Sequence, residues 1–472
     1  MSNDALELFN PIASVVLSSE PKSSTFRLDA QYHILFKKRA IKWKSKEMRR
    51  LDNCCLALYE VPPFKHIYVD KPNGIPFYTS STLFEVDLNP PHYLTAEMEK
   101  INVYKIKKGQ ILMARSGDVD SGIMGQLIMV GNKLNNCTTS DHVLRFTPND
   151  KMINGGYLFA YLSSDFCKGE LLKNAAGSVI PAIRPDSLRD IQVPIVERNI
   201  EEQIGTKIYE AVTAREKAID LNSAAKDEML RSNNLRSLKD LASNFNGTAN
   251  SFKVSSIEVL NSLRFDAHFY NPMAQLAAKS IKACGSQVKQ MRVLADRIFM
   301  CNRFARTYVD KNNGLPFLSG KNIIQIRPIG LKYVSNLETE QLSELQLKRG
   351  WVLITRSGTI GRACLVRDNY EGWCATEDII RVVPKESEID GGYLYAFLSS
   401  EYGYEQILRN CHGSVIDHIT PEQIGTVLIP ICSPERQKTI GDKVRSAYEK
   451  RGEAIHLEDE AQQLLMKALT GK

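Results

Sequence analysis

The sequence repeats itself over most of its length, with each segment returning 236 to 241 residues later. In chain order the matching pairs are FRLDAQYH (26–33) with LRFDAHFY (263–270), YVDKPNGIPF (68–77) with YVDKNNGLPF (308–317), KKGQILMARSG (107–117) with LKRGWVLITRSG (347–358), NGGYLFAYLSSDF (154–166) with DGGYLYAFLSSEY (390–402), and GSVIPAIRP (177–185) with GSVIDHITP (413–421). A colinear series at so long a period indicates a duplicated domain rather than a solenoid of short repeats. The chain is therefore expected to fold into two similar units.

Each copy contains the same predicted elements in the same order. The apolar stretches at 110–115 and 351–356 are bounded by glycine and predict buried strands. The stretches at 155–164 and 391–400 follow a Gly-Gly break and predict helices. Strands and helices are thus mixed in both copies, which favours an α/β (α+β) fold class.

A long amphipathic segment follows each copy. Apolar residues recur at helical spacing, at Ile204, Ile208 and Val212 after the first copy and at Ile440 and Val444 after the second. Such stripes need a partner, and we expect the two helices to pack antiparallel as a coiled-coil-like pair. The prediction is a pseudo-two-fold repeat, with the domains and helical regions running in order over 1–196, 197–236, 237–432 and 433–472.

Composition narrows the class of protein. Of 472 residues, 43% are hydrophobic and 24% are charged, with a net charge of +7 that suits a nucleic-acid partner without requiring one. We expect no signal peptide and no membrane-spanning run, and hence a cytoplasmic protein. The ten cysteines include no CxxC pair, so neither zinc nor a disulfide framework is expected.

Taken together, these patterns resemble the DNA-specificity (S, HsdS-type) subunits of Type I restriction–modification systems and of Type I-like Type II systems. The resemblance rests on LxxRSG at 112–117 and 353–358, on the GSVI segments, on the helical region after each domain, and on PFLSGKNI at 316–323. It implies that the two globular parts are target-recognition domains, each reading one half of a bipartite sequence in double-stranded DNA.

The resemblance also implies partners and the absence of catalysis in this chain. Two methyltransferase (M) subunits would dock on the helices, bind S-adenosylmethionine and methylate adenine N6, and the helices would set the spacer of the target. A restriction (R) subunit using ATP and Mg²⁺ could join them. No cofactor and no metal are expected in this chain.

Two groups of residues are candidates for contact with phosphates. The first is the basic stretch 37–50, from which we select Lys37, Lys38, Arg39, Lys42 and Lys44; a solvated helix face would explain it equally well. The second is the strand-turn of each domain, Arg115-Ser116-Gly117 and Arg356-Ser357-Gly358. Glycine lets a backbone approach a phosphate, and serine and arginine donate to it. An internally paired arginine in a tight structural turn is the alternative.

The repeated GSVI phrase supplies the candidates for reading bases. Gly177-Ser178 and Gly413-Ser414 begin the same loop in both copies, after which the residues diverge. Arg184 favours guanine, whereas Asp417 accepts from cytosine and His418 lies beside it. Lys321 and Asn322 are further candidates in the second domain.

Two other classes of function remain open from the sequence. One is a fused DNA-modifying enzyme, a methyltransferase or nuclease, since NPPH at 89–92 approaches an adenine methyltransferase motif. That motif needs an aromatic ring where His92 stands, and no glycine-rich cofactor loop precedes it. The other is a protein-only scaffold whose basic stretches serve solubility.

Overall fold

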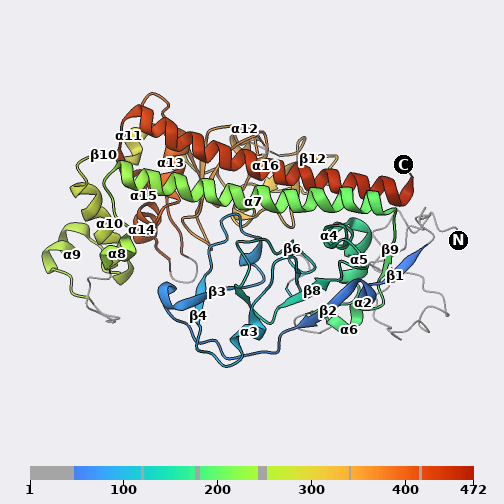
Figure 1. Cartoon of the computed structure of the whole chain (residues 1–472). Coiled ribbons are helices and arrows are strands. Elements are labelled where there is room, and N and C mark those ends of the chain that lie inside the picture. The colour runs from blue at the N-terminus through green and yellow to red at the C-terminus, as the bar shows by residue number, and fades with distance from the viewer. Residues whose placement is uncertain are drawn as a thin grey trace. The chain divides into compact units, whose positions relative to one another are not determined.

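A computed structural model describes residues 47–117, 122–175, 181–242, 252–339, 342–368, 370–413 and 417–471. The chain divides into two compact units: unit 1 comprises 1–216 with 453–472, and unit 2 comprises 217–452. Both units mix helices with short strands (Figure 1), so the predicted α+β fold class is confirmed. The unit boundaries fall inside the two long helices, and the domain limits expected from the sequence stay an expectation.

Unit 1 is built from short strands and helices followed by one long helix. Its strands are β1 (Met48–Arg50), β2 (Cys55–Glu60), β3 (Gly74–Tyr78), β4 (His92–Thr95), β5 (Ile111–Ala114), β6 (Leu127–Met129), β7 (Thr138–Thr139), β8 (Val143–Pro148) and β9 (Gln192–Pro194). Its shorter helices are α2 (Leu51–Cys54), η3 (Lys71–Asn73), η4 (Thr82–Phe84), α3 (Ile101–Tyr104), α4 (Gly155–Ser163), α5 (Asp165–Leu172) and α6 (Pro185–Leu188). The predicted strand at 110–115 and helix at 155–164 are thereby confirmed as β5 and α4.

Unit 2 repeats the strands of unit 1 and has additional described helices between α7 and its first strand. Its strands are β10 (Gln287–Gln290), β11 (Ala295–Phe299), β12 (Gly314–Leu318), β13 (Lys332–Ser335), β14 (Val352–Thr355), β15 (Ala363–Leu365), β16 (Cys374–Ala375), β17 (Ile379–Pro384) and β18 (Leu428–Ile431). Its shorter helices are α8 (Leu238–Ala242), α9 (Ser256–Ser262), η5 (Ala267–Tyr270), α10 (Pro272–Ala283), α11 (Met291–Leu294), η6 (Asn322–Ile324), α12 (Leu342–Leu345), α13 (Gly391–Leu398), α14 (Glu401–Arg409) and α15 (Pro421–Gly425). The second predicted strand and helix are confirmed as β14 and α13.

The two units share one sheet topology. Unit 1 has sheets in the order β2-β8-β5-β6, β4-β3-β7 and β1-β9, and unit 2 has β11-β17-β14-β15, β13-β12-β16 and β10-β18. Among the described strands of each unit, only the pair made by the short last strand of the three-stranded sheet is parallel, β3–β7 and β12–β16. Even the register shift recurs, at Cys55/Ala57 and at Ala295/Arg297. The duplication read from the sequence is therefore a duplication of structure.

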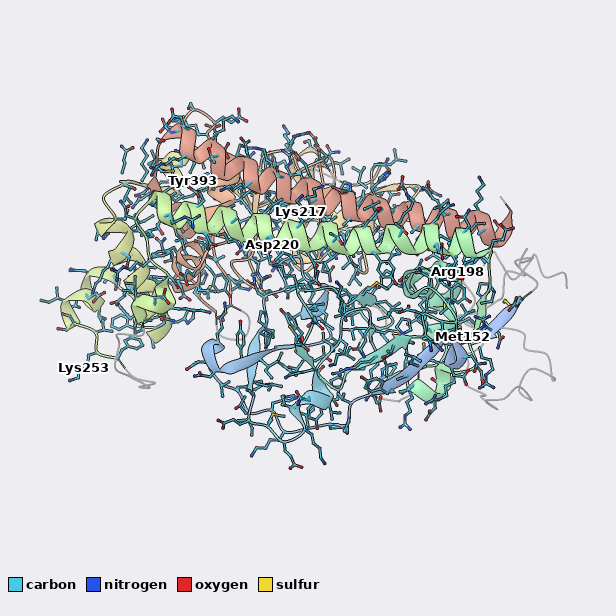
Figure 2. The ribbon with its side chains drawn as sticks, viewed as in Figure 1. Met152, Arg198, Lys217, Asp220, Lys253 and Tyr393 are labelled. Carbon is cyan, nitrogen blue, oxygen red and sulfur yellow. The ribbon has the colours of Figure 1, made fainter. Side chains whose placement is uncertain are left out.

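The two predicted long helices are α7 (Arg198–Ser232), labelled at its start in Figure 2, and α16 (Pro434–Thr470). Within unit 1, Lys207 of α7 lies 2.7 Å from Glu460 of α16, and Arg215 pairs with Glu458. Within unit 2, Glu228 of α7 lies 3.6 Å from Lys443 of α16. Farther along α7 in unit 2, the Ser232 carbonyl accepts from Arg436 of α16 at 3.5 Å. In both units the residue numbers thus rise on one helix as they fall on the other, so the predicted antiparallel pairing is confirmed (Figure 1). None of the described helices is both long and apolar enough to span a membrane.

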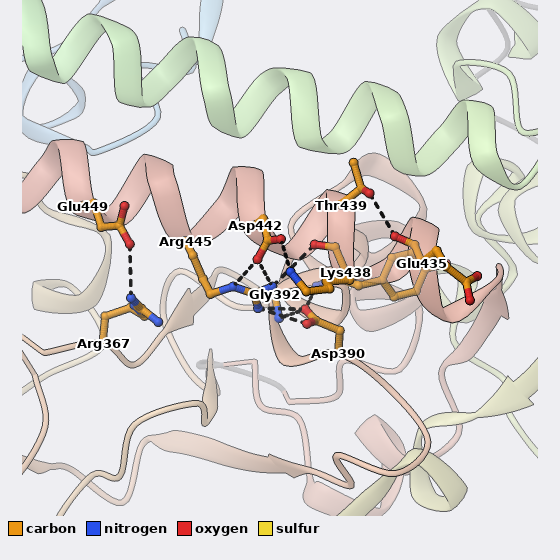
Figure 3. A network of polar contacts seen from close by, with 10 residues as sticks. Arg367, Asp390, Gly392, Glu435, Lys438, Thr439, Asp442, Arg445 and Glu449 are labelled. Carbon is orange, nitrogen blue, oxygen red and sulfur yellow. Dashed lines mark hydrogen bonds and ion pairs between the residues drawn. The ribbon is translucent and has the colours of Figure 1, made fainter.

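Paired glycines explain how each long helix meets its own domain. In unit 2 a Cβ on Gly392 of α13 would lie 2.7 Å from the Cα of Gly441 of α16, and a Cβ on Gly441 would lie 2.0 Å from Oδ1 of Asp390. Asp390 caps α13, and Arg445 of α16 reaches it at 3.0 Å (Figure 3). The same glycine contact joins Gly156 to Gly205 in unit 1. The Gly-Gly phrases of α4 and α13, and the glycines Gly205 and Gly441 of the long helices, thus serve close helix packing.

Each unit has its own hydrophobic core between the helices and the four-stranded sheet. In unit 2 the core includes Tyr393 of α13 (labelled in Figure 2), whose hydroxyl donates to the carbonyl of Pro430 at 2.5 Å. In unit 1 the equivalent Tyr157 donates to the carbonyl of Pro194 at 2.7 Å. The core of unit 1 also takes in Leu465 and Leu469 from the end of α16, both with no exposed surface.

Candidate nucleic-acid interface

The strand-turn of unit 1, at 115–117, contacts the end of the closing loop. We use the name closing loop for the segment around the GSVI phrase, 175–185 in unit 1 and 411–421 in unit 2. Strand β5 ends at Ala114, and the next residues form the turn. Ser116 makes an isolated antiparallel bridge with Ala182, and the Ile183 amide donates to the Arg115 carbonyl at 2.8 Å. Two segments separated by more than sixty residues in sequence therefore form one small surface, close to the exposed Arg184.

The same junction forms in unit 2. Ser357 bridges to His418, which is the counterpart of Ala182. The His412 amide donates to the His418 carbonyl at 3.0 Å, and the His418 amide donates back to the His412 carbonyl at 2.7 Å. The two ends of the closing loop are thus held together beside the strand-turn. Gly413 and Asp417 are exposed next to this clasp.

The turn arginines are internally paired in both units. Arg115 forms an ion pair with Glu60, at the end of β2, and Arg356 lies 3.1 Å from Asp378. The arginine side chains are only 18% and 17% exposed. Of the two readings that the sequence left open for these arginines, the geometry supports the structural one.

The carboxylate that holds this arginine has changed position between the copies. The shared register of β8 and β17 aligns His142 with Asp378, and the register of β2 and β11 aligns Glu60 with Met300. The Arg115 amide donates to His142 O and the Arg356 amide donates to Asp378 O, each at 3.0 Å. The partner carboxylate thus comes from the end of β2 in unit 1 and from the residue before β17 in unit 2.

A fully buried arginine supports the segment behind each turn. Arg381 donates to the carbonyls of Ala375 at 2.5 Å and Ile379 at 2.7 Å, and so braces the turn that presents Asp378. Arg145, its counterpart, donates to Tyr104 O at 2.7 Å and to Thr139 Oγ1 at 3.0 Å. Burial lowers the pKa of both guanidinium groups. Carbonyl oxygens take the place of a carboxylate as their partners.

The serine and glycine of the turn differ in exposure between the units. Ser116 is buried, and its hydroxyl lies 2.7 Å from His142 Nδ1. Gly117 faces Ile123, because an added Cβ would come within 2.5 Å of that side chain. Ser357 is half-buried, and Gly358 is exposed with φ +69° and open space where a Cβ would stand. Close approach of a ligand backbone is thus open at Gly358.

The remaining candidates separate into exposed and interior residues. Lys321 is exposed on a loop whose Gly320 lies against Thr355, so it lies near the second strand-turn. Asn322 is buried: its Oδ1 accepts from Ser319 and its Nδ2 donates to the Ile329 carbonyl at 2.9 Å. That bonding gives Asn322 a structural role in its loop. His418 is half-buried, and its Nδ1 has no hydrogen-bond partner among the described residues.

Several predicted contacts fall outside the described residues. They are Lys37, Lys38, Arg39, Lys42, Lys44, Gly177, Ser178 and Ser414.

One feature was missed by the sequence reasoning. Tyr68 is 49% exposed and lies with its ring centroid 4.3 Å from that of His92. In unit 2, Tyr308 is 45% exposed and Lys332, the counterpart of His92, stands 4.9 Å from its ring centre. The signal was present, since both tyrosines open the repeated YVDK phrase. The second member of each pair lies on the partner strand, so only the fold brings the pair together.

The NPPH stretch and the adjacent carboxylates at 377–378 have structural contacts. Glu377 is buried in an ion pair with Arg306, and Asp378 holds Arg356. His92 lies on β4 in the stack with Tyr68. Among the described residues, no group of three side chains is arranged to hold a metal ion.

Comparison with known proteins gives a family. The model for the Type I restriction modification DNA specificity domain matches residues 62–231 and 300–457. A search of curated proteins found no match.

Solved structures with similarity to the chain include an HsdS subunit from Thermoanaerobacter tengcongensis (18% identity, 91% of this chain, 97% of that chain, TM-score 0.28). A Type I S subunit from M. genitalium is 13% identical over 92% of this chain and 98% of that chain, with a TM-score of 0.37. A chain from a structure on complex assembly and conformational transition of the type I R-M system is 18% identical over 90% and 97%, with a TM-score of 0.28. Because the two segments matched by the family model together make up more than half of the sequence, this chain belongs to the Type I restriction–modification DNA specificity family.

Proposed function

We propose that this chain is the non-catalytic sequence-recognition subunit of a restriction–modification methyltransferase, and that each domain reads one half of a bipartite DNA target. One observation supports this most directly. The two domains build the same junction, Ser116 with Ala182 and Ser357 with His418, on the same sheets. A common framework with different side chains at the junction suits two modules that bind the same kind of ligand in different sequences.

The proposed reading surface lies around this junction. Arg184 in domain 1 and Asp417 in domain 2 are exposed there and differ in charge. Arginine pairs with guanine and a carboxylate accepts from cytosine, so the two domains would prefer different bases. His418 and Lys321 are further contacts in domain 2, and Gly358 and Gly413 allow close approach of the DNA backbone.

Affinity would come mainly from phosphates. The basic stretch that contains Lys37, Lys38, Arg39, Lys42 and Lys44 is proposed for this role, with Gly177, Ser178 and Ser414 at the closing loops. The polar side chains of the turns have a supporting role inside the domain in this proposal. They are bonded to neighbouring side chains: Arg115 to Glu60, Ser116 to His142 and Arg356 to Asp378. The exposed Tyr68 and Tyr308, which bridge to Leu94 of β4 and Val334 of β13, would add aromatic surface.

The proposed partners are two methyltransferase subunits, which would dock on α7 and α16, bind S-adenosylmethionine and methylate adenine N6. The antiparallel pairing of these helices supports a role in fixing the spacer, since a helix of 35 residues is ~50 Å long at 1.5 Å per residue. A restriction subunit with ATP and Mg²⁺ could join. This chain would hold no cofactor and would work in the cytoplasm without contact with a membrane.

The test is to express the chain with its methyltransferase partner and to map N6-methyladenine across a genome. The expected result is a split motif with a fixed gap. Exchanging the two domains should exchange the two half-sites. An unsplit motif, or one that ignores the exchange, would refute the assignment of one half-site to each domain.

A point variant sharpens the same test. Arg184→Ala should relax the motif at one or two base pairs of a single half-site, at a cost of about 1–3 kcal/mol in discrimination. Arg189→Ala is the matched control, because Arg189 lies five residues away with a side chain that is 44% exposed but is paired with Asp186 at 3.0 Å. The control should leave the motif unchanged.

A further inference from the structure

The segment 263–270, LRFDAHFY, is one of the repeated phrases, and the function proposed above gives it no role. Its counterpart at 26–33 lies outside the described residues. In unit 2 the segment contains the short helix η5 and stands before α10. What it contacts indicates why it is present.

Hydrogen bonds within the segment fix its conformation. Asp266 accepts from the Phe269 amide at 2.9 Å, which caps η5, and from Arg264 Nε at 2.7 Å. The Tyr270 hydroxyl donates to the Arg264 carbonyl at 2.6 Å. The hydrogen bond from Arg264 holds the pKa of Asp266 below its ordinary value, so the carboxylate stays charged at neutral pH. Arg264 is thereby fixed in one orientation.

The segment is hydrogen-bonded to the residues that begin the closing loop. Arg264 Nη2 donates to the carbonyl of Cys411 at 3.2 Å. In the opposite direction, Arg409 Nε donates to the carbonyl of Phe269 at 3.0 Å. The Phe269 ring lies near both guanidinium groups, with its centre 4.1 Å from Arg409 and 4.8 Å from Arg264. Two hydrogen bonds and one cation–π contact, between Arg409 and Phe269, join the segments, and the contact between Arg264 and Phe269 lies within the first of them.

The gripped residues lead directly into the candidate reading surface. Cys411 is followed by His412, which exchanges two backbone hydrogen bonds with His418. His418 in turn bridges to Ser357 of the strand-turn. A continuous set of contacts thus runs from Arg264 to the residues beside Asp417.

We propose that the Arg-x-Asp-Ala segment, 264–267, is a clamp that positions the described ends of the closing loop, at 411–413 and 417–418, before DNA binds, with Arg264 as the positioning residue. This inference rests on the proposed function. Arg264 acts through its hydrogen bond to Cys411, which fixes the clasp at His412 and His418. Loop ends that are already held together at His412 and His418 lose less conformational freedom on binding, and this favours affinity and discrimination at that half-site.

The clamp is tested in the assembled complex of the full chain with its methyltransferase subunits. Arg264→Gln removes the charge that bonds both Asp266 and Cys411. Arg297→Gln is the matched control, because Arg297 is an exposed arginine of the same unit that stacks on Phe299, with its Cζ 3.8 Å from the ring centre. Binding is measured on three duplexes: the full target, one with the first half-site changed, and one with the second changed.

For Arg264→Gln we expect discrimination at the half-site of domain 2 to fall roughly tenfold to a hundredfold, as for loss of hydrogen bonds to a charged group. Discrimination at the half-site of domain 1 should stay unchanged, and the control should match the parent at both. Asp266→Asn should resemble Arg264→Gln, since it frees the same guanidinium.

The outcomes separate the clamp from general damage. An equal loss at both half-sites, together with a lower melting temperature, would make Arg264 a merely structural residue and overturn the clamp. Unchanged discrimination in both variants would overturn it too. If the parent complex itself discriminated at neither half-site, the proposed function would fail, which is a different result from failure of the clamp alone.

Discussion

The most demanding prediction concerns the carboxylate that pairs with the turn arginine, which is Glu60 in unit 1 and Asp378 in unit 2. Replacing Glu60 with the residue at its counterpart, Glu60→Met, removes the partner of Arg115 while keeping a long side chain at the position. Arg115 is 18% exposed and Glu60 is 36% exposed, so the pair is neither a free surface pair nor a sealed one. A hydrogen bond to a charged group contributes about 1.5–3 kcal/mol and an exposed pair below about 1 kcal/mol. We expect a loss of about 1–2 kcal/mol.

The second substitution should restore the pair from the other strand. His142→Asp places a carboxylate where Asp378 stands in the second domain, 3.1 Å from its arginine. Alone it costs the Ser116–His142 hydrogen bond, about 0.5–1.5 kcal/mol. In the Glu60→Met background it should recover about 1 kcal/mol, because it resupplies the missing charge.

Hydrogen exchange at the Arg115 amide, which donates to His142 O, reports the free energy of local opening at the turn. The parent, both single variants and the double variant form a cycle whose coupling should favour the double variant by about 1 kcal/mol or more. Additive losses would refute the exchange of acids between the two positions. The mirror pair, Asp378→His with Met300→Glu, repeats the test in domain 2.

Two further predictions follow from the packing and the thiols. Gly441→Ala should destabilise unit 2 by about 1–3 kcal/mol in chemical denaturation, because the added Cβ would stand 2.0 Å from Asp390 Oδ1. The control is Gly452→Ala in the same helix, where an added Cβ has nothing within 4 Å. This control should be neutral or stabilising by up to about 1 kcal/mol. Burial raises the pKa of the Cys54 and Cys137 thiols to about 11. Their contribution to stability is therefore complete below the ordinary thiol pKa of ~8.5 and is lost as the pH rises toward 11, which a pH series of denaturation curves above pH 8 would detect as a steady decline.

The repeat made much of the fold predictable. Periodicity identified α7 and α16, and the glycine-bounded apolar runs identified β5 and β14, because these elements are set by local spacing. The antiparallel helix pairing followed from two stripes that each lacked a partner. The Gly-Gly phrases were read only as breaks, since a contact such as Gly392 with Gly441 joins residues far apart in sequence.

The candidate site was less predictable for the same physical reason. That the strand-turn and the closing loop belong together was suggested by their shared repetition, but the bridge from Ser357 to His418 is a tertiary contact. Whether Arg356 is free depends on Asp378, which the sequence places twenty-two residues away. Asn322 looked available by residue type, whereas its loop turns the side chain inward.

The apolar residues at the end of α16 bear on how the protein is made. Ala461, Leu465 and Leu469 complete the core of unit 1, whose other residues precede position 217. At about 5–20 residues per second, a ribosome needs on the order of ten seconds or more to add the chain between them. During that time the apolar residues of unit 1 that α16 later covers remain exposed. We therefore expect a nascent or truncated chain without its last turns to be a preferred client of chaperones and proteases.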